Sequence, residues 1–111
     1  AWLDIDGEAA FVEATERLLA LGHRRIGFIG APEQFTYARH RRDGYLKALR
    51  QAGISTDAEL VVVTERAAIE DGAAATARLL TQSQAPTAIL AATDMLAFGA
   101  LSALRSAGLR V

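Results

Sequence analysis

Two apolar segments joined by a loop constrain the fold of this chain more than any other feature. Residues 18–30 read LLALGHRRIGFIG, and residues 41–53 read RRDGYLKALRQAG. Gly22 suits the left-handed position that ends a helix, and Gly53 provides a second helix stop. Residues 26–29 form a compact apolar run before Gly30, as in a buried strand. Together the two segments predict a helix, a strand, a loop and a second helix, which is one α/β crossover unit.

The same alternation continues along the whole chain. Apolar residues recur at helical spacing in the first predicted helix, at Phe11, Ala14, Leu18 and Leu21. Short apolar runs predict strands at residues 2–5, 26–29, 60–63 and 88–91. Helices are expected at residues 8–21, 37–52, 69–82 and from 94 to 106 or 107. The β-α-β-α-β-α-β-α order predicts an α/β fold in which helices flank a parallel β-sheet on both faces.

Composition narrows the class of protein. The chain has 111 residues, 51% of them hydrophobic, a formal net charge of −1 and no cysteine. It can bury a core, its net charge gives no reason to bind nucleic acid, and disulfides, thiolate metal sites and thiol catalysis are excluded. The lack of cysteine suits a cytoplasmic protein, and no apolar run is long enough to span a membrane. Because the chain starts at Ala1 without Met and stops at Val111, we expect residues 1–111 to form a single partial domain.

Several motifs in a fixed order resemble the LacI/GalR family of bacterial transcription regulators. Family members carry an aspartate after a strand, a Leu-Gly-His-basic-basic-Ile run, an Arg-x-x-Gly-aromatic helix, and later Pro-Thr-Ala-Ile, Ala-Asn-Asp and Gly-Leu-Arg-Val segments. The counterparts here are Asp6, LGHRRI at 21–26, RRDGY at 41–45, PTAI at 86–89, ATD at 92–94 and GLRV at 108–111. The resemblance covers essentially the whole chain.

The resemblance implies a periplasmic-binding-protein-like domain of two lobes with an effector bound between them. This chain matches mainly the C-terminal lobe, so the helix-turn-helix and most of the N-terminal lobe are expected outside it. The implied function is effector sensing in a homodimeric regulator, by ligand-induced lobe rearrangement, with operator DNA bound only through the absent N-terminal domain. The effector is expected to be a sugar, a sugar phosphate or a nucleoside-like molecule. No cofactor and no metal are expected.

Arg41 is the leading candidate for effector binding. It lies in the first turns of the helix after a strand, and ligands of parallel α/β sheets bind beyond the carboxyl ends of the strands. The planar guanidinium suits sugar hydroxyls or a carboxylate. The alternative is an exposed arginine near a helix end. In the resembling family, the arginine at this position commonly holds the effector.

Five further residues are candidates at or near the same rim. Thr93 and Asp94 follow a strand, and either can cap the next helix. The family usually has Asn where Thr93 stands, which favours a pocket altered from the usual sugar site. Phe35 and Tyr37 can line the pocket mouth, and Asp6 can contact the ligand or form a turn with Gly7.

Arg66 stands beside Ala67, where many sugar-sensing members have an aromatic residue. It indicates an acidic or phosphorylated effector, although a solvated loop arginine is the more ordinary interpretation. His23, Arg24 and Arg25 follow a helix C-terminus at the opposite end of the strands, so we interpret them as structural.

The apolar stripe Met95, Phe98 and Leu101 belongs to the core or to a subunit interface. The corresponding family helix helps form the dimer, which makes Phe98 the first candidate for packing across a two-fold axis.

Two other functions remain to be compared with the regulator. A periplasmic solute-binding protein of an uptake system has the same fold, and an upstream signal peptide rather than a helix-turn-helix would identify it. An enzyme is not expected, because the chain has no dinucleotide or phosphate-binding glycine motif and no Cys.

Overall fold

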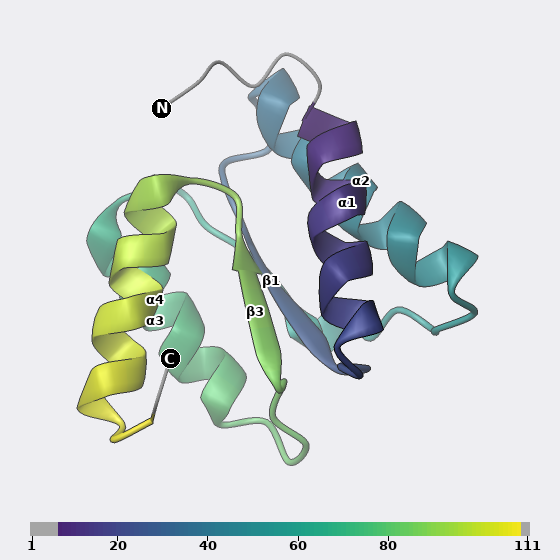
Figure 1. The fold of residues 1–111 in the computed structure, drawn as a ribbon. Coiled ribbons are helices and arrows are strands. Elements are labelled where there is room, and N and C mark those ends of the chain that lie inside the picture. The colour runs from purple at the N-terminus through teal and green to yellow at the C-terminus, as the bar shows by residue number, and fades with distance from the viewer. Residues whose placement is uncertain (1–6, 110–111) are drawn as a thin grey trace.

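The computed structural model describes residues 7–109, and these form alternating helices and parallel strands around one sheet (Figure 1). The predicted strand at residues 2–5, and Asp6, lie outside the described residues. The elements are α1 (Gly7–Ala20), β1 (Ile26–Gly30), α2 (Thr36–Gln51), η1 (Ala58–Leu60), β2 (Val61–Val63), α3 (Ile69–Leu80), β3 (Ala88–Ala91) and α4 (Asp94–Ser106).

The sheet has the strand order β2-β1-β3, and both pairings are parallel. Phe28 of β1 lies opposite Val61 on one side and Leu90 on the other. All five residues of the central strand β1 are buried, whereas β3 is half-buried throughout. The predicted α/β class with a parallel sheet is therefore confirmed.

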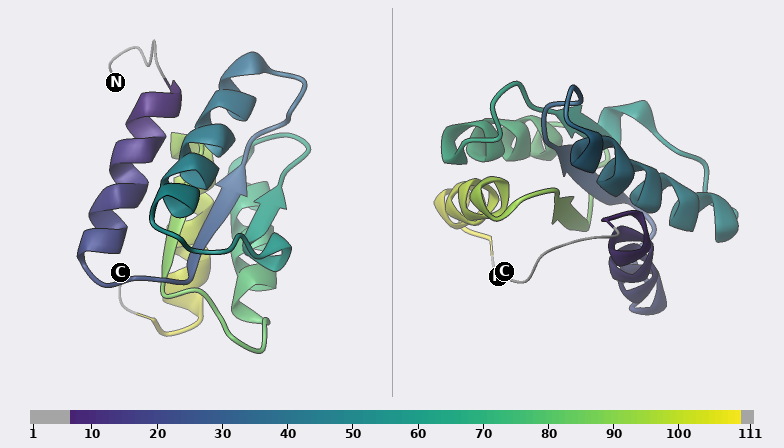
Figure 2. Two further views of the ribbon diagram at one scale, coloured as in Figure 1. Left: turned by 90° about the vertical axis from the view of Figure 1, so that its right-hand side faces the viewer. Right: turned by 90° about the horizontal axis from the view of Figure 1, so that it is seen from above.

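The helices cover the sheet in two pairs. Helices α1 and α2 pack together on one face, and α3 and α4 pack together on the other, with the strands between the pairs (Figure 2). This layering places every described helix against the sheet and sets the carboxyl ends of all three strands at one rim.

An aromatic cluster fills the core on the α1–α2 side. The Phe28 ring meets the Phe11 ring edge-on at 6.0 Å between centroids, and it stacks on Tyr45 at 5.0 Å. Phe28 and Tyr45 are at most 1% exposed, and the Tyr45 hydroxyl donates to the Ile26 carbonyl at 2.5 Å. Because that hydrogen bond satisfies the one polar group of the ring, Tyr45 can be buried at little cost.

Glycines allow the helices of each pair to approach closely. A Cβ on Gly44 of α2 would overlap the Glu8 carbonyl oxygen of α1 and lie 3.0 Å from Phe11 Cβ. On the other face, a Cβ on Gly99 of α4 would overlap the Ile69 carbonyl oxygen of α3. Each contact requires a residue without a side chain.

The element ends confirm most of the sequence prediction. Gly22, Gly53 and Gly108 have φ of +100°, +75° and +75°, as expected for helix stops. The placement of Leu21 on the buried stripe was wrong. Helix α1 ends at Ala20, and the Leu21 side chain is 76% exposed. Strand β2 begins one residue later than predicted, because residues 58–60 form a 3₁₀ turn in which the Asp57 carboxylate accepts from the Glu59 N–H.

An apolar groove runs beside the outer edge of β3, between α1 and α4. It has a volume of about 790 Å³ and is lined by Leu18 of α1, Ile89 of β3 and Leu101 of α4 among others. Among the described residues, no strand pairs with this edge.

Candidate functional site

One face of α2 runs from the core to the sheet rim. Tyr37, Arg41 and Tyr45 follow each other at four-residue spacing and therefore share that face. Tyr45 is buried against β1, Arg41 is half-buried, and Tyr37 is 37% exposed. The face thus presents an arginine and an aromatic ring where the strands end.

Arg41 is held in a defined position at this rim. Its Nη1 donates to the Ala92 carbonyl at 2.6 Å, and its guanidinium carbon lies 4.8 Å from the centroid of the Tyr37 ring. Ala92 directly follows β3, so the arginine reaches from α2 to the end of the neighbouring strand. The guanidinium therefore lies at the rim formed by the carboxyl ends of the strands. A planar group fixed between a ring and a carbonyl is preorganised to hydrogen-bond a ligand.

Phe35 and Tyr37 extend the Arg41 site outward. Their rings stack with centroids 5.9 Å apart and an interplanar angle of 28°, and 48% of Phe35 is exposed. Ring faces are large apolar surfaces that bind planar groups or the C–H face of a sugar. Sequence reasoning named both residues but not their stacking, because rotamers are not encoded in the spacing.

Thr93 and Asp94 lie at the start of α4, next to Ala92. The Thr93 hydroxyl oxygen accepts from the Leu96 N–H at 3.2 Å, so Thr93 is the N-cap and Asp94 is the first, exposed helical residue. The Thr93 hydroxyl can still donate its own hydrogen. The structure therefore brings Thr93 to the Arg41 side of the rim, through the Ala92 carbonyl.

Arg66 belongs to a different contact. It follows β2, on the other side of β1 from Ala92, and its Nη2 lies 3.0 Å from Asp71 Oδ1. The hydrogen bond from Arg66, followed by the one from the Ala68 N–H, lowers the pKa of Asp71. Between them, Ala67 has a φ of 60°, a left-handed conformation that is unusual for a residue with a side chain. The structure does not join Arg66 to the Arg41 group.

The basic residues at 23–25 lie at the opposite end of the strands. His23 Nδ1 lies 2.8 Å from the Thr87 hydroxyl, just before β3. Arg25 donates to the Gln84 carbonyl at 2.8 Å and contacts Asp57 Oδ2 at 3.3 Å. These contacts connect loops at the amino ends of the strands, as the structural interpretation predicts.

Helix α4 presents an exposed apolar patch, formed by Met95 and Phe98 together with Ile69 of α3. These side chains are 50%, 56% and 41% exposed. Sequence reasoning missed Ile69, which the close approach of α3 to Gly99 places beside α4. Leu101 is separate from the Met95–Phe98–Ile69 patch, because it lines the groove beside β3.

Within residues 7–109, no group of three or more His, Cys, Asp or Glu residues is placed to hold a metal ion. None of the helices in the same range has both the length and the apolar character needed to cross a membrane.

Comparison with known proteins places the chain in a family. Residues 15–111 match the family described as periplasmic binding protein-like domain. The chain is 37% identical to the HTH-type transcriptional regulator AglR of Rhizobium meliloti (strain 1021), over 99% of this chain and 31% of AglR. The chain spans about a third of the length of the curated relatives it matches.

Solved structures give the same result. A regulatory protein of the LacI family from Chloroflexus aggregans is 37% identical, with a TM-score of 0.89 over 94% of this chain and 37% of that one. A sugar-binding transcriptional regulator of the LacI family from Escherichia coli, complexed with phosphate, is 28% identical, with a TM-score of 0.89 over 96% of this chain and 38% of that one.

The chain therefore belongs to the periplasmic binding protein-like domain family. Its relatives are LacI-type transcriptional regulators, which confirms the resemblance. They are regulators rather than enzymes.

Proposed function

We propose that this chain is the C-terminal lobe of the effector-sensing domain of a LacI-type transcriptional regulator. One lobe provides one wall of the pocket, and Arg41, Phe35, Tyr37 and Thr93 are its binding residues. The observation that carries the proposal is the Arg41 guanidinium, fixed at the carboxyl rim between the Tyr37 ring and the Ala92 carbonyl.

The effector is a small ring compound in this proposal: a sugar, a sugar phosphate or a nucleoside-like molecule. The exposed, stacked rings of Phe35 and Tyr37 favour a ligand with a flat or apolar face. Arg41 and the Thr93 hydroxyl supply donors for its hydroxyl or carbonyl oxygens. Arg66 already pairs with Asp71. This arginine is therefore less available to bind a phosphate group at the β2 end of the rim.

The mechanism is a shift between two lobe arrangements. An effector that binds one arrangement better than the other moves the equilibrium toward it by its difference in affinity. In a homodimer joined through α4, this shift changes the spacing of DNA-binding domains that lie outside this chain. We infer that the protein binds operator DNA only through those domains, performs no catalysis and acts in the cytoplasm.

The binding site is tested by thermal shift and calorimetry on the full-length protein. D-glucose, D-glucose 6-phosphate and adenosine serve as probes, with the wild type, Arg41→Ala and Arg50→Ala compared. Arg50 is an exposed arginine near the end of the same helix, and Arg50→Ala removes the same charge as Arg41→Ala. We expect a probe that stabilises the wild type to bind Arg41→Ala at least tenfold more weakly, since a charge-assisted hydrogen bond contributes about 1.5–3 kcal/mol.

Arg50→Ala is expected to bind as the wild type does. Equal binding by wild type and Arg41→Ala would show that the pocket is elsewhere. An equal loss of probe affinity in Arg41→Ala and Arg50→Ala would show that Arg41 acts only through its contribution to net charge.

A further inference from the structure

The loop between β1 and α2 lacks the usual device for starting a helix. Phe35 occupies the N-cap position with φ −92° and ψ 132°, and its side chain accepts no hydrogen bond. The first turn of α2 also contains no acidic residue. Ser, Thr, Asp or Asn at this position typically stabilises a helix relative to a residue that cannot cap. The chain gives up this stabilisation and exposes an aromatic ring instead.

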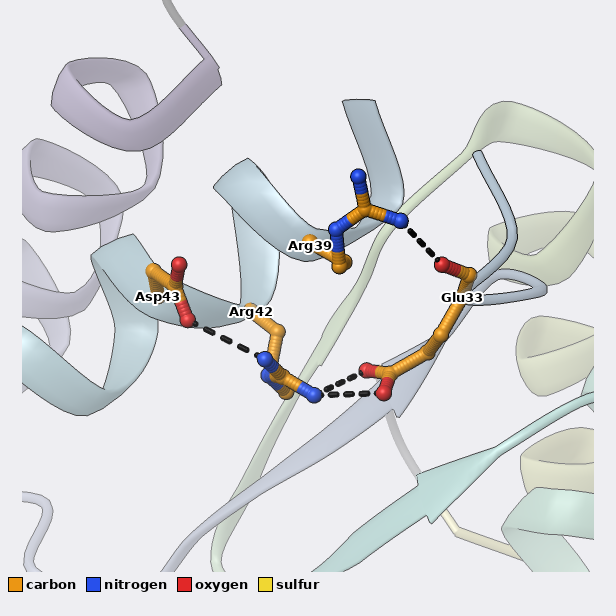
Figure 3. Close-up of polar contacts among 4 residues, drawn as sticks. All are labelled: Glu33, Arg39, Arg42 and Asp43. Carbon is orange, nitrogen blue, oxygen red and sulfur yellow. Dashed lines mark hydrogen bonds and ion pairs between the residues drawn. The ribbon is translucent and has the colours of Figure 1, made fainter. Parts of the chain in front are cut away.

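Glu33 connects this loop to α2 in another way (Figure 3). Arg42 Nη1 donates to both carboxylate oxygens of Glu33 at 2.5 Å, and Arg39 Nη1 donates to the Glu33 backbone carbonyl at 2.6 Å. The side chain and the main chain of one loop residue are therefore both bound by the first two turns of α2. Phe35 and Tyr37 lie in the segment that these contacts close.

Arg42 is itself held firmly. Its side chain is 28% exposed, that of Glu33 is 33% exposed, and Arg42 Nη2 contacts Asp43 at 3.3 Å. Arg42 Nε is buried with no hydrogen-bond partner among the described residues. A buried donor without a partner costs free energy, so the two carboxylate contacts must offset that cost to keep the arginine here.

The contacts between Glu33 and Arg42 are distinct from the proposed binding site at Arg41. Arg42 follows Arg41 directly and so points about 100° away from it around the helix. Arg42 bonds Glu33, whereas Arg41 bonds Ala92 beyond β3. Glu33 can therefore affect ligand binding without contacting the ligand itself.

We propose that Glu33 is a positioning residue, which holds the loop before α2 so that Phe35 and Tyr37 stack in line with Arg41. This inference rests on the proposed function, because it assigns to Glu33 the preorganisation of that site. Preorganised groups bind a ligand more tightly, because no binding free energy is lost in ordering them.

The experiment uses the full-length protein with Glu33→Gln, the double variant Glu33→Arg/Arg42→Glu, and Asp43→Asn. Asp43→Asn is the matched control, because it removes the other carboxylate on Arg42 and leaves the loop contact intact. Amide hydrogen exchange of residues 34–38 is measured without ligand. Dissociation constants are measured for D-glucose, D-glucose 6-phosphate and adenosine, together with the melting temperature.

We expect Glu33→Gln to speed exchange of residues 34–38 about tenfold and to weaken probe binding by a similar factor, with little change in melting temperature. The double variant, in which the two charges are swapped, is expected to restore the exchange rate and the probe affinity to wild-type values. Asp43→Asn is expected to change neither quantity. If Glu33 only stabilised the fold, Glu33→Gln would lower the melting temperature. The local exchange rate and the affinity would then change in proportion to that loss of stability.

Unchanged exchange in Glu33→Gln overturns the inference, as does faster exchange with unchanged affinity. Arg41→Ala, measured in parallel, separates the two proposals. If Arg41→Ala loses binding and Glu33→Gln does not, the proposed function stands and the role of Glu33 is rejected. If both bind as the wild type does, the site itself is misplaced and both proposals fail.

Discussion

Tyr45 shows how a single residue couples the fold of this protein to pH. Its ring stacks on Phe28, and its hydroxyl donates to the Ile26 carbonyl in a buried position. Burial, and secondarily the charge of Asp57, raises the pKa of Tyr45 from 10.0 to about 12. The folded protein therefore holds this proton at a pH where the unfolded chain releases it.

The sign of the effect follows from linkage. Below pH 10 the hydroxyl is protonated in both states and its contribution to stability is complete; this contribution is lost as the pH rises from 10 toward 12. We expect the free energy of unfolding to fall across that window in the wild type, measured by urea denaturation. In Tyr45→Phe stability is lower below pH 10, because the hydrogen bond is gone, and the fall above it is reduced. An equal decline in both proteins would contradict this assignment.

At this scale the sequence predicted the position of Arg41 but not its partner. Helical spacing puts Arg41 on the face of Tyr45, and the strand-to-helix order puts its head at the rim. The Ala92 carbonyl lies 51 residues away, so no local pattern could identify it. Leu21 was wrongly predicted as buried, because periodicity does not show that the helix ends one residue earlier.

Helices in this protein are organised as two close pairs, and each pair depends on glycine. Glycine stops were predictable at Gly22, Gly53 and Gly108, because each follows an apolar helical pattern. The role of Gly44 was not, since the Glu8 carbonyl that excludes a side chain belongs to another helix. Element order thus follows from sequence, whereas helix-to-helix distance follows from packing.

Gly44→Ala tests the α1–α2 pair. Alanine favours a helix over glycine by about 1 kcal/mol, so propensity alone predicts stabilisation. We expect destabilisation by about 1–3 kcal/mol instead, because the new Cβ meets the α1 backbone, which cannot move like a side chain. Denaturant unfolding measures the change. Arg50→Ala, an exposed position on the same helix, controls for surface effects, and a Gly44→Ala protein more stable than wild type would show that the helices can separate without cost.

The whole molecule presents the Met95–Phe98–Ile69 patch on the face of α3 and α4. Exposed neighbouring apolar side chains of this size favour association between proteins. We propose that two copies pack through it about a two-fold axis, with Phe98 at the centre.

Phe98→Glu tests this association in the full-length protein. A charge at the centre of a buried interface is costly, so we expect the molar mass measured by light scattering to fall from that of a dimer to that of a monomer. Leu21→Glu is the matched control, because Leu21 is also an exposed apolar residue but lies at the other end of the strands. A Phe98→Glu protein that stays dimeric places the interface elsewhere.

The strand order has a consequence for the path by which this chain assembles. Central β1 leaves the ribosome before either of its partners, since β2 follows a whole helix later and β3 follows two. Until they arrive, α1 and α2 are the described elements nearest in sequence that can shield the apolar segment IGFIG. Parallel pairings between distant segments close slowly, and a strand waiting for them is exposed to wrong association. The α1–β1–α2 unit joins elements that are consecutive in sequence, so its glycine-dependent helix contact can form before the sheet is paired.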